Sequence, residues 1–198
     1  MAPRIHTLLL ASTALLVLGS LPGSAGPDGP VVVGGQATVT GAGSANVQVN
    51  QSTNNAIINW NTFNIGAGQS TTFVQPGTSS VTLNRVTGGL GPSEIYGTLT
   101  ANGHVFLINP DGVLVGASGV INTAGFLATT SDIRNQDFMA RRYNFSIPGH
   151  PNASIVNEGR ITATSGGFAA LVAPGVQQRH HHSNARHRRA RVGQQLHA

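Results

Sequence analysis

Six side chains in this 198-residue sequence are carboxylates, and a hydrolase or lyase would have to build its acid–base pair from them. The six are Asp28, Glu94, Asp111, Asp132, Asp137 and Glu158. Asp111 stands in a tight turn, whereas Asp132 and Asp137 stand in a charged segment of their own. Acidic side chains are usually solvated, so we assign these carboxylates to turns and to the protein surface. We therefore predict no catalytic residue and no enzyme.

Other residues with chemical potential have simpler explanations. Residues 66–71 (GAGQST) are faintly similar to a phosphate loop, but they lack its lysine and its following helix. His180, His181 and His182 could bind a metal ion, yet a basic tail offers no partners to fix their rings, so we predict no metal site and no cofactor. Trp60 could anchor a glycan, but we favour a buried aromatic, and we assign His104 to a strand rather than to a catalytic base.

The first 25 residues form a targeting segment. Arg4 supplies a positive charge, residues 8–18 are apolar, and Gly23, Ser24 and Ala25 are the small residues of a cleavage site. The apolar run of about 11 residues is short of the roughly 20 that span a bilayer. We therefore predict a signal peptide over residues 1–25 that the Sec machinery uses and that is cleaved before Gly26.

The composition favours strands and turns. The chain has 26 glycines, no cysteine, no lysine and only 9% charged residues. An exported chain without cysteine has no disulfide framework, so packing and hydrogen bonds must stabilise its fold. Little charge together with much Gly, Asn, Thr and Val disfavours a helical domain.

Residues 101–125 (ANGHVFLINPDGVLVGASGVINTAG) show the expected architecture most clearly. Three short apolar runs are separated by the turns 109–112 (NPDG) and 116–119 (GASG). Turns every ~7–10 residues also occur in sandwiches and barrels. Residues 95–101 and 156–163 nevertheless share a Gly-x-[Leu/Ile]-Thr-Ala pattern, which is typical of stacked coils. We therefore favour a β-solenoid with about 20 residues per coil.

Three segments depart from this pattern. Residues 26–43 are rich in Gly and Pro, and they form either a cap or a flexible leader. Residues 131–151 concentrate charge, and we expect a hairpin that leaves the coil and lies against its flank. Residues 177–198 contain five of the 11 arginines, five of the eight histidines and no acid, so the net charge of +5 belongs to this tail. The rest of the chain is formally neutral and indicates no nucleic-acid binding.

Four blocks resemble the N-terminal region of filamentous haemagglutinins, the secretion domain of two-partner-secretion exoproteins. They are residues 59–66 (NWNTFNIG), 83–86 (LNRV), 101–113 (ANGHVFLINPDGV) and 167–174 (GFAALVAP). The resemblance implies an all-β fold: a right-handed parallel β-helix with N-terminal capping strands and an extra-helical hairpin. It also implies recognition in the periplasm by the POTRA domains of a dedicated outer-membrane transporter, and nucleation of β-helix folding outside the cell.

The resemblance also suggests which residues matter. The first set is the turn Asn109, Pro110, Asp111, Gly112 and Val113, where the family has Asn-Pro-Asn-Gly. The second is a motif block made of Asn59, Trp60, Phe63, Asn64, Gly66, Asn84 and Arg85. A further family motif, Asn-Pro-Asn-Leu, has no clear counterpart, and residues 50–54 (NQSTN) occupy its place.

These observations divide the chain into a signal peptide (1–25), a secretion or haemagglutination activity domain (26–176) and a basic His/Arg tail (177–198). We expect the tail to be disordered and to derive from a frameshift, so that the chain is a truncated adhesin whose missing passenger would contact host cells. The expected location is the cell surface or exterior of a Gram-negative bacterium. Two alternatives stay open: a carbohydrate-active β-helix enzyme, and an exported module that binds anionic surfaces through its tail.

Overall fold

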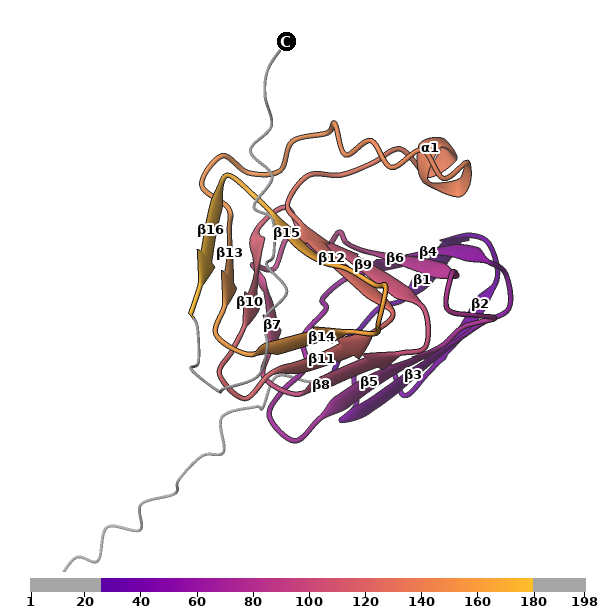
Figure 1. The fold of residues 1–198 in the computed structure, drawn as a ribbon, viewed down its shortest axis with the longest axis horizontal. Helices are drawn as coiled ribbons and strands as arrows, with labels where there is room; N and C mark the ends of the chain where they lie inside the picture. Colours follow the sequence, from indigo (N-terminus) through magenta and orange to yellow (C-terminus); the bar gives the residue numbers. More distant parts are fainter. Residues whose placement is uncertain (1–25, 180–198) are drawn as a thin grey trace, which may run out of the picture.

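The computed structural model describes residues 26–179, which wind into a coil of short strands (Figure 1). The predicted signal peptide and the tail from residue 180 onward lie outside the described residues. The strands are β1 (Val31–Gly34), β2 (Ala37–Thr40), β3 (Asn46–Gln51), β4 (Asn55–Trp60), β5 (Ser70–Val74), β6 (Val81–Val86), β7 (Ser93–Ile95), β8 (Thr98–Ala101), β9 (His104–Ile108), β10 (Gly112–Val115), β11 (Val120–Thr123), β12 (Gly125–Thr129), β13 (Ser154–Asn157), β14 (Arg160–Ala163), β15 (Ala169–Val172) and β16 (Gly175–Gln178).

These strands form three sheets. Sheet 1 has the order β1-β4-β6-β9-β12-β15, sheet 2 the order β16-β13-β10-β7, and sheet 3 the order β14-β11-β8-β5-β3-β2. From β6 onward the chain visits sheets 1, 2 and 3 in turn, and each strand pairs in parallel with its counterpart in the adjacent coil. The predicted parallel β-helix is confirmed. No helix among residues 26–179 is long and apolar enough to cross a membrane.

Side chains that point into the coil stack in rows. One row on sheet 3 runs through Val47, Thr71, Leu99, Ile121 and Ile161. In β3 buried and exposed residues alternate, as expected for a strand with one face in water. In β6 and β12 every residue is buried, so sheet 1 is covered on both faces.

The segment that covers the outer face of sheet 1 is the excursion, residues 130–153, between β12 and β13. It contains α1 (Asn135–Met139), and Figure 1 shows this helix beside β4 and β6. Ile133, Phe138 and Phe145 pack onto outward-facing residues of sheet 1. The expected hairpin is closed by one antiparallel bridge, Asp132 to Ile147, rather than by a ladder. A helical turn takes the place of the strands expected in this hairpin, and Phe138 of this turn packs onto the sheet.

The N-terminal end is capped, which decides between the two alternatives for residues 26–43. β1 pairs antiparallel with β4, and β2 pairs antiparallel with β3. Residues 61–65 occupy the position of sheet 2 but make only one parallel bridge, between Ile65 and Ile95. The ladder is interrupted because the Asn64 side chain, through Oδ1, accepts the Glu94 backbone N–H at 2.9 Å.

Candidate functional site

The turn that begins at Asn109 lies at the corner between sheets 1 and 2. Asn109 is 1% exposed, and its Oδ1 accepts the backbone N–H of Asp111 at 2.9 Å. Its Nδ2 donates to the carbonyl of Gly91 at 3.1 Å and to Ser93 Oγ at 3.0 Å, both in the preceding coil. The side chain therefore closes its own turn and ties it to the adjacent coil.

We expect Asn109→Ala to lower stability and secretion together. The change removes three hydrogen bonds and leaves the buried Ser93 hydroxyl and two half-buried backbone groups without this partner, which costs about 1–3 kcal/mol. The measurement is a thermal melt of the purified chain beside its secreted amount, and Asn122→Ala, at an exposed position of β11, is the control. A loss of secretion at an unchanged melting temperature would instead make Asn109 a contact residue for a partner.

The other turn residues connect the corner to the excursion. Nδ1 of His150 lies 2.7 Å from Asp111 Oδ1, and the His150 backbone N–H donates to the Pro110 carbonyl at 3.1 Å. Gly112 has φ +117°, and Val113 is buried in the core. The sequence predicted a turn here, but not that the excursion returns onto it.

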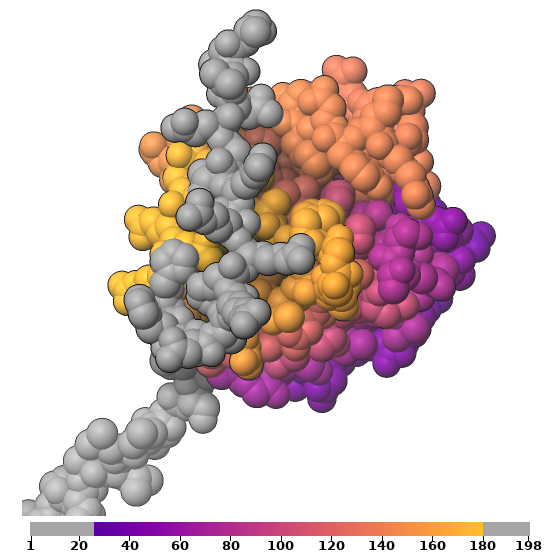
Figure 2. Space-filling model, viewed as in Figure 1, coloured from indigo at the N-terminus to yellow at the C-terminus, as the bar shows by residue number. Residues whose placement is uncertain are grey.

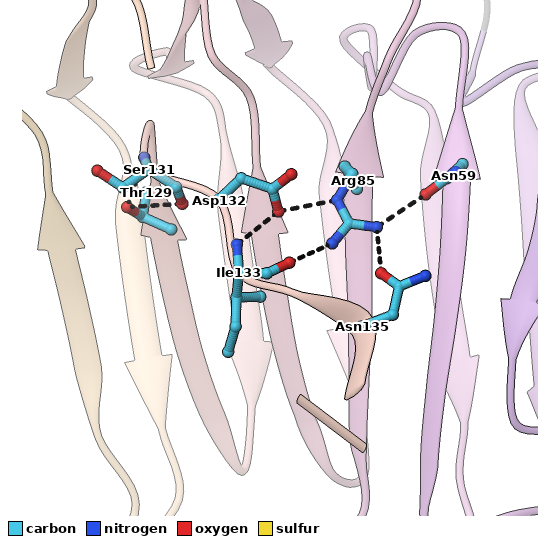
Figure 3. Close-up of polar contacts among 7 residues, drawn as sticks. All are labelled: Asn59, Arg85, Thr129, Ser131, Asp132, Ile133 and Asn135. Atoms are coloured by element: carbon cyan, nitrogen blue, oxygen red, sulfur yellow. Dashed lines mark hydrogen bonds and ion pairs between the residues drawn. The ribbon is translucent and has the colours of Figure 1, made fainter. Parts of the chain in front are cut away.

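The opposite end of the excursion is held by Arg85 of β6 (Figure 3). Arg85 Nε donates to Asp132 Oδ1 at 2.8 Å, Nη2 to the Ile133 carbonyl at 2.7 Å, and Nη1 to Oδ1 of Asn135 at 2.8 Å and of Asn59 at 3.3 Å. The side chains of Arg85 and Asp132 are 11% and 27% exposed. One guanidinium thus joins two strands of sheet 1 to the start of the excursion.

Of the rest of the motif block, Trp60, Phe63 and Asn84 are buried, whereas Asn64 and Gly66 are half-buried. Trp60 is fully buried, its Nε1 donates to Asn84 Oδ1 at 3.0 Å, and its ring meets that of Phe63 edge-on at 5.5 Å. The backbone N–H of Gly66 donates to Gln69 Oε1 at 2.8 Å. The assignment of Trp60 to the core is therefore confirmed, and these residues stabilise the first coils.

The structure corrects one assignment and adds residues that sequence reasoning missed. Asp132 was assigned to surface solvation, which is wrong, because its carboxylate pairs with Arg85. Asn135 and His150 were not predicted to contact either motif. The charge concentrated in residues 131–151 was a signal that this segment is anchored, but it could not identify Arg85 as the partner.

An aromatic cluster fills the space between the excursion and sheet 1. Phe106 of β9 meets Phe138, Tyr143, Phe145 and Phe168 at centroid distances of 5.2–6.2 Å. His104, also of β9, meets Phe168 edge-on at 5.4 Å, so it is a strand residue as expected. Burial lowers the pKa of His104, and the charge of Arg141 lowers it further.

This lowered pKa predicts an acid-sensitive stability. The unfolded chain protonates this imidazole near pH 6.5, whereas the folded chain holds it neutral to lower pH. Stability contributed by His104 is therefore present above pH 6.5 and is lost as pH falls toward the folded-state pKa. We expect the melting temperature to fall less between pH 7.5 and 5 in His104→Gln than in the wild type; parallel curves would contradict the assignment.

The carboxylates of residues 26–179 are mostly engaged. Asp111, Asp132, Asp137 and Glu158 each pair with a His or an Arg at 2.7–3.1 Å. Among the same residues no group of three or more His, Cys, Asp or Glu side chains could hold a metal ion. These pairings favour a structural role for the four carboxylates over acid–base chemistry.

Comparison with known proteins identifies the family. The protein-family model described as the TPS secretion domain, which is the domain of two-partner-secretion proteins, matches residues 24–194. The chain belongs to the TPS secretion domain family. The crystal structure of the HMW1 secretion domain from Haemophilus influenzae is similar, with a TM-score of 0.64 and 38% identity over 77% of this chain and 42% of that one.

Two heme/hemopexin-binding proteins of Haemophilus influenzae are also similar to this TPS secretion domain. One is 45% identical over 107 residues, which is 54% of this chain and 12% of that protein. The other is 37% identical over 139 residues, which is 67% of this chain and 15% of that protein. The chain thus spans a small part of these relatives. A TPS secretion domain implies an outer-membrane transporter partner in general, and the proteins of this family are exported by Gram-negative bacteria.

Proposed function

We propose that this domain is recognised in the periplasm by a cognate outer-membrane transporter, leads its chain across the outer membrane, and nucleates β-helix folding outside the cell. The heme/hemopexin-binding relatives share with it only 12% and 15% of their length. We therefore assign to this region the role of secretion, and not the binding of heme or hemopexin for which those proteins are named.

The observation that carries the proposal is the difference between the two ends of the described coil. Antiparallel strands β1 and β2 close the N-terminal end. At the other end β14, β15 and β16 are the outermost strands of all three sheets. Many of their residues are exposed, whereas all of β12 is buried. Among residues 26–179 the coil is thus capped at one end and has outermost parallel strands at the other, on which a further coil can pair.

The test is secretion with and without a transporter. The full chain is expressed in a Gram-negative host alone and together with each two-partner-secretion transporter of its source genome. We expect the chain in the medium only when one of these transporters is present. Equal amounts in the medium without any transporter, or none with every transporter, would overturn the proposal. A polysaccharide panel incubated with the secreted chain tests the enzyme alternative.

A further inference from the structure

Arg141 has an unusual backbone conformation for its residue type. Its φ is +58°, and all nine other residues of 26–179 with positive φ are glycine. Arg141 follows the C-terminus of α1, where its N–H donates to the Phe138 carbonyl at 2.9 Å and the N–H of Arg142 donates to the Asp137 carbonyl at 2.8 Å. This is the Schellman arrangement, in which glycine is the usual residue. Arginine is strained there because its Cβ crowds the backbone.

The two Schellman hydrogen bonds use only backbone atoms of Arg141, and any residue could make them. No carboxylate of residues 26–179 forms an ion pair with Arg141, because Asp137 pairs with Arg142 and Asp132 pairs with Arg85. A residue that breaks a local rule without an internal gain is a candidate for function.

The surroundings of Arg141 are aromatic. Arg141 is exposed and stands in the chain between Phe138 and Tyr143, whose ring centroids lie 5.7 Å apart. Tyr143 and Phe168 flank the buried ring of Phe106, at centroid distances of 5.2 and 6.1 Å, and are themselves 40% and 39% exposed. Tyr143 belongs to the excursion and Phe168 to the last described coil, which border each other in Figure 2 (orange and yellow).

We propose that Arg141, Tyr143 and Phe168, the Arg141 patch, bind a segment of the outer-membrane transporter that presents a carboxylate beside an apolar side chain. The proposal rests on the function proposed above. An unpaired guanidinium next to half-exposed rings complements that chemistry in charge and in polarity.

The experiment distinguishes a loss of binding from a loss of stability, because replacing Arg141 by glycine relieves the backbone strain while it removes the charge. The full chain, as wild type and as Arg141→Gly and Arg141→Asn, is tested for its melting temperature and for its affinity for the purified periplasmic region of the transporter that secretes the wild type. We expect Arg141→Gly to melt about 2 °C higher, because glycine relieves the strain. We expect both variants to bind about tenfold more weakly, because a charge-assisted contact is lost. Raising the salt concentration should weaken the wild type more than the variants.

The control is Arg134→Gln, which removes an arginine from the same excursion just before α1 and should bind as the wild type does. Wild-type affinity in both Arg141 variants would overturn the assignment of the patch while leaving the secretion function intact. If the Arg141 variants lose retention on heparin but keep their affinity for the transporter, the patch binds an anionic polysaccharide and the proposal is wrong. Failure of every transporter to bind the wild type would overturn the patch and the proposed function together.

Discussion

Gly112→Val is expected to prevent accumulation of folded, secreted chain. Gly112 has φ +117°, where a β-branched residue is strained by about 1–3 kcal/mol. A Cβ at this position would also lie 2.4 Å from the Ser154 carbonyl oxygen, which belongs to the paired strand of the next coil. Because this oxygen is backbone, the coils must separate. We expect a total loss above about 4 kcal/mol, a large part of the roughly 5–15 kcal/mol that stabilises a typical domain.

Two matched glycines separate the contributions of strain and of contact. Gly68 has φ +75° with no atom within 4 Å of an added Cβ, so Gly68→Val tests strain alone and should cost about 1–2 kcal/mol. Gly77 has open space and no positive φ, so Gly77→Val should change stability by less than about 0.5 kcal/mol. Chemical denaturation of the three variants gives the ranking. Equal costs for Gly112→Val and Gly68→Val would show that the coils tolerate the added side chain.

Local signals in the sequence favoured a β-solenoid, and the resemblance to the secretion domain implied that its strands are parallel. Turns such as residues 109–112 and the small residues at coil corners recur at short spacing, and alternation in β3 marks a strand with one wet face. The excursion was located for the same reason, since its charge interrupts the repeat. Its internal structure was not predictable, because α1 is a short helix fixed by Phe138 packing onto sheet 1 rather than by its own propensity.

The motif residues were also identified from the sequence, but their partners were not. Arg85 and Asp132 are far apart in the chain, and no local pattern connects a strand residue to the carboxylate that covers it. Likewise the contact of His150 with Asp111 depends on where the excursion returns. Such pairs are set by the topology, which places the Asn109 turn and both ends of the excursion around the same sheet. Local sequence patterns thus predicted the strands of the coil, whereas the contacts that hold the excursion against the coil are seen only in the structure.

Because Arg85 holds the start of the excursion against sheet 1, we expect Arg85→Ala to release the excursion. The variant removes all four hydrogen bonds of the guanidinium and leaves Asp132 as a partly buried charge without its partner. Breaking a buried pair costs about 3–5 kcal/mol. We expect a loss at the lower end of this range, because the Asp132 side chain is 27% exposed. Loss of the cover exposes Leu83 and Phe106 on sheet 1, so limited proteolysis should cleave within residues 131–151 before the coil itself unfolds.

The exposed pair of Arg142 with Asp137 is the matched control, because it lies in the same segment at the same 2.8 Å separation, with Arg142 61% exposed. A double-mutant cycle for each pair isolates its coupling energy. We expect about 0–1 kcal/mol for Arg142 and Asp137, since water and salt screen an exposed pair. The coupling of Arg85 and Asp132 should be clearly larger, and Arg85→Lys should not restore it, because one ammonium cannot reproduce the fork that contacts two strands and the excursion. Equal couplings in the two cycles, with no early cleavage of the Arg85 variant, would mean that the Arg85–Asp132 pair does not hold the excursion to the coil, which would leave that role to the aromatic packing on Phe106 and the His150 contacts.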